Sequence, residues 1–187
     1  PNGTSSLYKE FPDRCFDVGI AEANMVGVAA GLAAYGYKPI VVTFAPFATR
    51  RVCDQIAVSV AYAKQNVKIV GTDPGITAEL NGGTHMSFED IATLRSIPTM
   101  TIYDAVDDTQ VYQAIKQIMN TDGPCYIRMP RKAAQPVYDE NYKFALNKAD
   151  VITKGNDITI VASGIMVAES LKAVLKLKEE GISAELI

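Results

Sequence analysis

The chain has 187 residues, a formal net charge of −3, and 48% hydrophobic and 21% charged residues, which is an ordinary composition for a globular protein. The acidic balance argues against nucleic acid as the main partner, and no apolar run reaches the roughly 18 residues that a membrane span needs. Three widely spaced cysteines, Cys15, Cys53 and Cys125, indicate reduced core residues of a cytoplasmic protein. Because His85 is the single histidine, a multi-histidine metal centre is excluded.

One apolar helix dominates the N-terminal part of the chain. Residues 1–14 are polar and lack periodicity, and residues 15–18 are predicted to form a short strand. Apolar and small residues then recur at helical spacing over 21–35, and Gly36 is a natural end for this helix. A helix that is apolar nearly all round is normally buried. Its first turn holds one acidic residue, Glu22, where the helix dipole favours a negative charge.

Strands and helices alternate along the rest of the chain. Runs of β-branched and aromatic residues predict strands at 39–43, 67–71, 99–103 and 125–128. Apolar periodicity predicts helices at 47–64 and 107–119. A further helix is expected to begin at a capping box formed by Ser87 and Asp90 and to end near Ser96. The irregular loop 72–85 is long for a compact domain, and loops of this length are usually functional.

This alternation predicts an α/β fold with a mostly parallel sheet and helices on both of its faces. Residues 132–155 are interpreted as a linker, in which Pro136, Tyr138 and Tyr142 are expected to lie against a surface. The β-α-β unit that follows is too short to bury both faces of a sheet. We therefore expect three parts in chain order, the second domain being incomplete: a first domain at 1–131, the linker at 132–155 and a second α/β domain at 156–187.

Three stretches together carry a family resemblance: GIAEANMVGVAAGLAAYGYKPIVVTFAPFATRRVCDQ, GGTHMSFEDIATLRSIPTMTIYDAVD and DGPCYIRMPR. They resemble, in this order, the pyrimidine-binding domain of transketolase-type thiamine diphosphate enzymes. The resemblance covers most of 11–131 and continues into what is similar to the start of the family's C-terminal domain. It implies that the first strand of the pyrimidine-binding domain is missing. Deoxyxylulose-phosphate synthases and the β subunits of 2-oxoacid dehydrogenases share this layout.

The resemblance implies roles in cofactor binding for four residues. Glu22 matches the catalytic glutamate, whose carboxyl group bonds to the aminopyrimidine ring of thiamine diphosphate and promotes loss of the cofactor's reactive proton. Phe47 matches the aromatic residue that packs on this ring, and Phe44 lines the same pocket. Arg50 stands where deoxyxylulose-phosphate synthases carry arginine and transketolases often carry an aromatic residue. From the residues alone, a glutamate that only complements the helix dipole is the readier interpretation of Glu22, and Phe44 is more readily a core residue.

The substrate side of the predicted site rests on the long loop and on the end of the last strand. His85 matches a histidine that faces the substrate, so it is a candidate for both catalysis and substrate binding. Asn81 stands where transketolases have an aspartate that contacts the donor, and Asp73 stands where they have another histidine. Arg131 matches an arginine that binds the substrate phosphate, for which a guanidinium fork is well suited. A plain surface arginine is an equally good reading of this last residue.

The family binds Mg²⁺ and the cofactor's diphosphate through a GDG motif and a downstream asparagine, and the chain has no GDG. No metal ligand is therefore predicted in this chain. The resemblance implies a partner, an N-terminal transketolase subunit or domain, in a homodimer or α2β2 assembly. The expected activity is the transfer of a two-carbon ketol unit between sugar phosphates. The alternatives that stay open are a deoxyxylulose-phosphate synthase and a 2-oxoacid dehydrogenase β-type subunit.

Overall fold

The computed structural model describes residues 5–132 and 134–187, which form two compact units. The first unit comprises residues up to Tyr103 together with Asp122–Lys132, and the second comprises Asp104–Thr121 and the chain after Lys132. By compactness, therefore, the segment 104–121 groups with the C-terminal part of the chain. The domain boundaries expected from the sequence stay a prediction.

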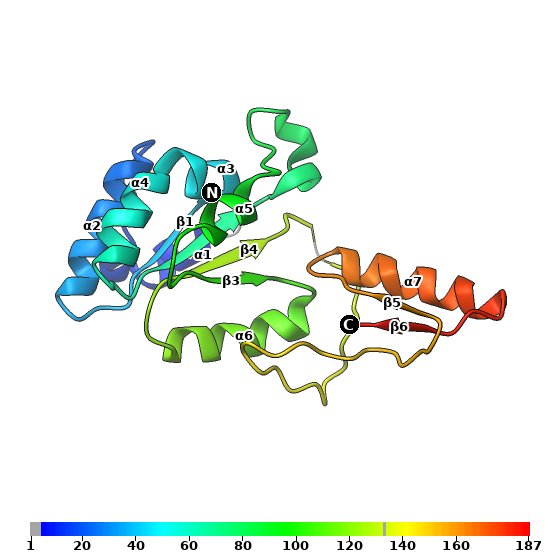
Figure 1. Cartoon of the computed structure of the whole chain (residues 1–187). Coiled ribbons are helices and arrows are strands. Elements are labelled where there is room, and N and C mark those ends of the chain that lie inside the picture. The colour runs from blue at the N-terminus through cyan, green and yellow to red at the C-terminus, as the bar shows by residue number, and fades with distance from the viewer. Residues whose placement is uncertain (1–4, 133) are drawn as a thin grey trace. The chain divides into compact units, whose positions relative to one another are not determined.

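The first unit is built on a sheet with strand order β1-β2-β4-β3 (Figure 1). The strands of this sheet are β1 (Ile40–Phe44), β2 (Lys68–Thr72), β3 (Thr101–Asp104) and β4 (Cys125–Met129). β1 pairs with β2, and β2 pairs with β4, in parallel. The α/β fold with a parallel sheet, predicted from the alternating sequence pattern, is confirmed. The carboxyl ends of β1, β2 and β4 therefore share one edge, which is where ligands bind in such folds.

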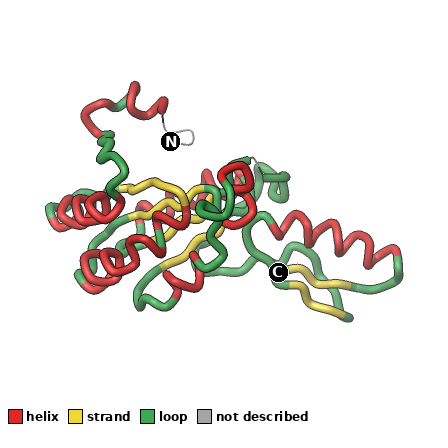
Figure 2. Tube along the Cα trace, turned by 90° about the horizontal axis from the view of Figure 1, so that it is seen from above, coloured by secondary structure: helices red, strands yellow, loops and turns green. Residues whose placement is uncertain are grey.

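The first unit also contains helices of several kinds. They are α1 (Ser5–Glu10), η1 (Pro12–Arg14), α2 (Glu22–Ala34), α3 (Ala45–Ala48), η2 (Arg50–Val52), α4 (Cys53–Gln55), η3 (Ile56–Tyr62), η4 (Gly75–Asn81) and α5 (Asp90–Arg95). The buried core joins apolar side chains of α2, β1, η3, β2, α5 and β4. α1 buries none of its residues, and Figure 2 shows the N-terminal segment standing away from the sheet. None of the helices described is long and apolar enough to cross a membrane.

Two local predictions are wrong. Residues 15–18 form no strand, and Phe16 and Asp17 of this segment are exposed. The single helix expected over 47–64 is divided into α3, η2, α4 and the π-helical η3. The break lies at Thr49, whose φ of −128° and ψ of −87° are not helical and whose hydroxyl donates back to the carbonyl of Ala45 at 2.7 Å. The apolar periodicity nevertheless holds, since Val52, Ile56 and Val60 are all buried.

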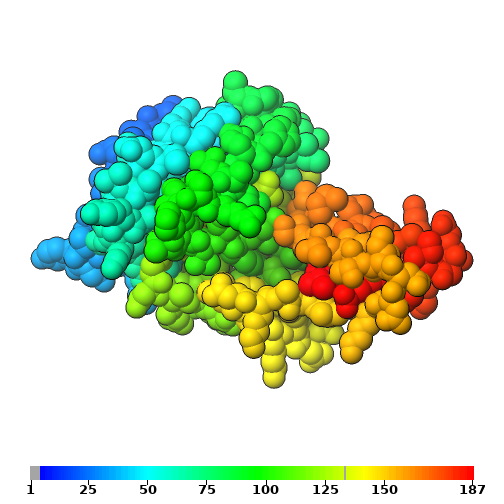
Figure 3. Space-filling model, viewed as in Figure 1, coloured from blue at the N-terminus to red at the C-terminus, as the bar shows by residue number. Residues whose placement is uncertain are grey.

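The second unit combines α6 (Asp108–Asn120) with α7 (Met166–Glu179) and a two-stranded parallel sheet of β5 (Ile158–Ile160) and β6 (Ala184–Leu186). Figure 3 shows the segment before β5, in yellow, at the surface. Asp107 caps α6 by accepting from the Gln110 amide, and its other oxygen accepts from the amides of Val137 and Tyr138.

Side-chain amides of α6 hold the same segment further along. Gln113 donates to the carbonyl of Tyr142 and accepts from the amide of Phe144, and Gln117 repeats the pattern with Phe144 and Leu146. The rings of Tyr138 and Tyr142 stack with their centroids 3.8 Å apart, and both hydroxyls donate to Asp150. The segment is therefore anchored by these residues, whereas Pro136, expected to lie against a surface, is exposed.

Candidate active site

Three aromatic rings meet at the edge of the sheet where β1 ends. Phe44 is the last residue of β1, Phe47 lies in the short helix α3, and His85 ends the long loop after β2. The centroid of the His85 ring is 5.1 Å from those of Phe44 and Phe47, and the two phenylalanine centroids are 6.0 Å apart. All three pairs meet edge to face, an arrangement that aromatic rings favour. The structure thus brings together three residues that lie on separate elements.

Glu22 joins this aromatic cluster through a residue that the sequence analysis passed over. Its carboxyl group, at the start of α2, accepts a hydrogen bond from Arg51 Nη1 at 2.9 Å. The side chain of Glu22 is 11% exposed, whereas that of Arg51 is 44% exposed. The Arg51 guanidinium also lies over the Phe47 ring, with its central carbon 3.8 Å from the ring centroid. Glu22 and Phe47 therefore flank one flat cationic group.

Arg50 lies next in the chain to Arg51 but makes different contacts. Its Nη1 donates to Glu89 Oε1 at 2.8 Å, and its Nη2 donates to the carbonyl of Thr84 at 3.3 Å. Burial alone would raise the pKa of Glu89, but backbone hydrogen bonds and the bond from Arg50 outweigh it and lower that pKa. Arg50 therefore ties η2 to the residues on either side of His85. Its predicted role toward a cofactor stays a prediction.

Arg131 follows β4 and is held by the loop after β2. Its Nε donates to Asp73 Oδ1 at 2.8 Å, and its Nη2 donates to Asn81 Oδ1 at 2.5 Å. Asp73 is fully buried and has a φ of 56°, which is uncommon for a residue other than glycine. The guanidinium carbon of Arg131 is 6.0 Å from the Phe44 ring centroid. The predicted substrate-binding residues Asn81 and Arg131 are thus in direct contact beside the aromatic cluster.

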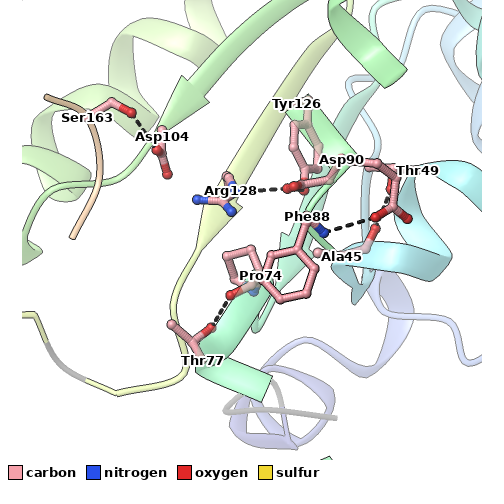
Figure 4. A network of polar contacts seen from close by, with 11 residues as sticks. Ala45, Thr49, Pro74, Thr77, Phe88, Asp90, Asp104, Tyr126, Arg128 and Ser163 are labelled. Carbon is pink, nitrogen blue, oxygen red and sulfur yellow. Dashed lines mark hydrogen bonds and ion pairs between the residues drawn. The ribbon is translucent and has the colours of Figure 1, made fainter. Parts of the chain in front are cut away.

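A second buried carboxylate, that of Asp90, connects α5 to β4. Asp90 Oδ2 accepts from the Tyr126 hydroxyl and from Arg128 Nε, each at 2.8 Å (Figure 4). The predicted capping box of Ser87 and Asp90 is wrong, because α5 has no side-chain cap and the buried Ser87 hydroxyl has no partner among the residues described. Asp90 contacts β4 instead of its own helix. This network links α5 to the strand that precedes Arg131.

No cluster of three or more metal-ligating side chains occurs in the part of the chain that the structure describes.

The residues of the candidate site fall into two connected groups. Glu22, Arg51 and Phe47 form one group, and Asp73, Asn81 and Arg131 form the other. Phe44 and His85 contact each other between them, with Phe44 lying near both Phe47 and Arg131.

Comparison with known proteins assigns the family. Residues 1–136 match the model of the transketolase pyrimidine-binding domain, and residues 147–187 match that of the transketolase C-terminal domain. The chain is 56% identical over 179 residues to the 6-deoxy-6-sulfo-D-fructose transketolase subunit SqwH of Clostridium sp. (strain MSTE9), which covers 96% of this chain and 56% of the relative. It is 42% identical to a putative transketolase C-terminal section of Methanocaldococcus jannaschii, covering 98% of this chain and 59% of the relative.

A solved structure described as a split gene transketolase, inactive beta4 tetramer, superposes with a TM-score of 0.88 at 38% identity. The match covers 98% of this chain and 59% of that one. The chain therefore spans somewhat more than half the length of the relatives that it matches. The resemblance seen in the sequence is confirmed: the chain belongs to the transketolase family.

Proposed function

We propose that the chain is part of a transketolase subunit that transfers a two-carbon ketol unit between sugars, with thiamine diphosphate as cofactor. The family assignment supports this proposal, as do relatives that are named transketolase subunits. The observation that carries it is the pair formed by Glu22 and Phe47. The family resemblance assigns these two side chains to the aminopyrimidine ring, and both contact the same flat group in this structure.

The contacts of Arg51 test whether these two side chains fit such a ring. A guanidinium is planar and nitrogen-rich, it donates a hydrogen bond to Glu22, and it lies over the face of Phe47. An aminopyrimidine is also planar and nitrogen-rich, and it would be held by the same carboxyl group and the same ring face. The residues present therefore fit the cofactor's pyrimidine end.

Each residue of the site has a role that follows from its chemistry. When bound, thiamine diphosphate supplies a nucleophilic carbon and an electron sink for breaking and forming carbon–carbon bonds. Glu22 would hold a proton between its carboxyl group and a ring nitrogen, and Phe47 and Phe44 would exclude water from one face of the ring. His85 would donate to, or accept from, a substrate oxygen, and Arg131 with Asn81 would bind the far end of the sugar.

The rest of the site would come from another polypeptide or domain. The chain has no GDG motif for Mg²⁺ and diphosphate, so we infer that a partner carries this half and that the cofactor lies between the two. A cytoplasmic location and a homodimer or α2β2 assembly are part of the same proposal. The donor and acceptor are phosphorylated sugars or close analogues, and one relative is named for a sulfonated sugar.

Replacing Glu22 with Gln in the complete complex tests this function. The amide keeps the shape of the side chain but cannot share a proton with a ring nitrogen as a carboxyl group does. We expect turnover to fall by a hundredfold or more, in line with the roughly 10²–10⁴-fold contribution of general acid–base catalysis, while assembly is unchanged. Glu169→Gln is the control, because this exposed glutamate also pairs with a cation, Lys172, at 2.7 Å. Full activity of Glu22→Gln would refute the assignment.

Substrate tests separate the alternatives that the sequence left open. A transketolase subunit completed by its partner should turn over a ketose donor such as xylulose 5-phosphate or a sulfonated analogue. A synthase or a 2-oxoacid dehydrogenase subunit should instead require pyruvate or another 2-oxoacid. Turnover of pyruvate without turnover of any ketose would contradict the ketol-transfer proposal while leaving the cofactor assignment intact.

A further inference from the structure

The corner of the site around Arg131 is balanced in charge. The guanidinium of Arg131 meets the carboxylate of Asp73 at 2.8 Å, and the Asp73 side chain is completely shielded from solvent. The neighbouring Lys132 pairs with Glu79 at 3.0 Å. Arg131 therefore has a fully buried carboxylate partner, whereas the pair of Lys132 and Glu79 is exposed and screened by solvent.

Arg131 is also fixed in orientation. Its Nε is bound to Asp73 and its Nη2 to Asn81, and Nη1 has no further partner among the residues described. Because Phe44 lies 6.0 Å from the guanidinium carbon, the arginine borders the aromatic cluster. A bound anion would meet one edge of a guanidinium that is already paired with a carboxylate on another edge.

We infer that Asp73 shifts the selectivity of this corner toward a sugar whose far end carries one negative charge, such as a sulfonate, and away from a sugar that ends in a phosphate dianion. This inference rests on the proposed ketol transfer. A phosphate ester carries roughly −1.5 to −2 charges near neutral pH, whereas a sulfonate carries one. Arg131 attracts the dianion about twice as strongly as the monoanion, and the buried Asp73 carboxylate repels it about twice as strongly as well. Asp73 therefore offsets the preference for the dianion that the arginine alone would give.

The backbone at Asp73 supports a role beyond folding. Its φ of 56° lies in the left-handed region, where a non-glycine residue costs of order 1–3 kcal/mol. The carboxylate also accepts from the Thr72 hydroxyl at 3.0 Å, which holds it in place beside Arg131. Asp73 acts through Arg131 and is therefore a positioning and specificity-determining residue.

The test compares two donors with the same ketose skeleton, one ending in a sulfonate and the other in a phosphate, in the complete complex. The quantity measured is the ratio of their kcat/KM values. We expect Asp73→Asn to shift this ratio toward the phosphate by about tenfold relative to the wild-type complex. Glu79→Gln is the matched control, because this carboxylate is 59% exposed and pairs with Lys132 rather than Arg131. It should leave the ratio within about twofold.

A strong wild-type preference for the phosphate would overturn the inference, because Asp73 would then not offset the attraction of Arg131, and this measurement does not depend on whether a variant folds. An unchanged ratio in folded Asp73→Asn would overturn it as well, as would an equal shift in Glu79→Gln. A complex that binds thiamine diphosphate but transfers from neither donor would instead refute the proposed ketol transfer itself. The two failures are therefore distinguishable.

A separate observation concerns Arg51. Its guanidinium makes the same two contacts that the aminopyrimidine ring would make, one with Glu22 at 2.9 Å and one with the Phe47 face at 3.8 Å. Ring and guanidinium cannot occupy this place together. We propose, again on the basis of the proposed function, that Arg51 holds the place of the ring in the cofactor-free chain and leaves when thiamine diphosphate enters. The half-exposed side chain can move into solvent without disturbing the core.

Cofactor affinity measures this competition directly. Removing an ion pair and a cation–π contact, each worth up to about 1 kcal/mol at a partly exposed site, should lower the Kd of the complete complex for thiamine diphosphate by about three- to thirtyfold in Arg51→Met. Arg95→Met, at an exposed arginine of α5, should leave the Kd unchanged. Calorimetric titration gives both values. An unchanged or raised Kd in Arg51→Met, with the wild-type complex binding normally, would overturn the proposal.

Discussion

Replacing Asp107 with Ala should destabilise the second unit more than any nearby charge change. Asp107 is 4% exposed. Its Oδ1 accepts from the Gln110 amide at 2.9 Å, and its Oδ2 accepts from the amides of Val137 and Tyr138, both at 2.8 Å. One carboxylate therefore both caps α6 and fixes the segment that leads toward β5. Alanine would leave all three amide donors without this acceptor.

The size of the effect follows from these contacts. Loss of an N-cap costs about 1 kcal/mol, and a hydrogen bond to a charged group contributes about 1.5–3 kcal/mol. Since the three bonds share one carboxylate, their contributions do not add fully. We expect a loss of about 3 kcal/mol in the free energy of unfolding. Asp107→Asn should lose about half as much, because one of its two acceptor oxygens remains.

Urea unfolding of the wild type and the variants measures this loss, and limited trypsin digestion reports on the exposed Lys143 and Lys148 of the anchored segment. Asp108→Ala is the matched control. Asp108 is adjacent and exposed and contributes mainly through the helix dipole, so its loss should cost less than about 1 kcal/mol. Equal losses in Asp107→Ala and Asp108→Ala, or no change in cleavage at the two lysines, would refute the reasoning.

Three further predictions concern other buried groups. Burial, together with the bond to Asp150, raises the pKa of Tyr142 from 10.0 to about 12. Its neutral phenol therefore stabilises the fold below pH 10, and this contribution should be lost as the pH rises through about 12; a urea midpoint that falls equally in Tyr142→Phe would contradict this. Burial also raises the pKa of the Cys125 thiol to about 11, so a thiol reagent should modify the partly exposed Cys15 and Cys53 first, as followed by mass spectrometry. Tyr126→Phe removes one of the two bonds to Asp90 Oδ2 and should cost about 1–3 kcal/mol in thermal or urea unfolding, and a smaller loss would show that this network adds little.

The regular elements could be predicted because their signals are local. The apolar pattern and Gly36, with its φ of 98°, locate the first helix at 21–35, and the structure has it at Glu22–Ala34. The break at Thr49 could not be predicted in this way. Apolar periodicity reports which side chains are buried, and Val52, Ile56 and Val60 stay buried whether or not the backbone is one continuous helix. The false capping box has a similar cause, because Asp90 finds better partners on a distant strand.

The candidate site also has a part that the sequence predicts and a part that depends on tertiary contacts. Glu22, Phe47 and His85 could be singled out through the family resemblance, but their contacts depend on how three separate elements converge. Arg51 was missed because two consecutive arginines look alike in a sequence. They are neighbours in η2, yet Arg50 contacts Glu89 and Arg51 contacts Glu22. Asp73 drew notice only as a departure from the family pattern, and its buried contact with Arg131 explains why an acid stands there.

The glutamine ladder of α6 limits how the connecting segment can evolve. Gln113 and Gln117 are one helical step of four residues apart, a rise of about 6.0 Å, and they engage Tyr142, Phe144 and Leu146 at every second residue, a spacing of about 6.6 Å in an extended chain. These two spacings are close enough for both glutamines to bond to the segment at the same time. A one-residue insertion between Tyr142 and Leu146 would put the wrong backbone atoms opposite one of the two glutamines. Length changes should therefore be tolerated before or after this short stretch, but not within it.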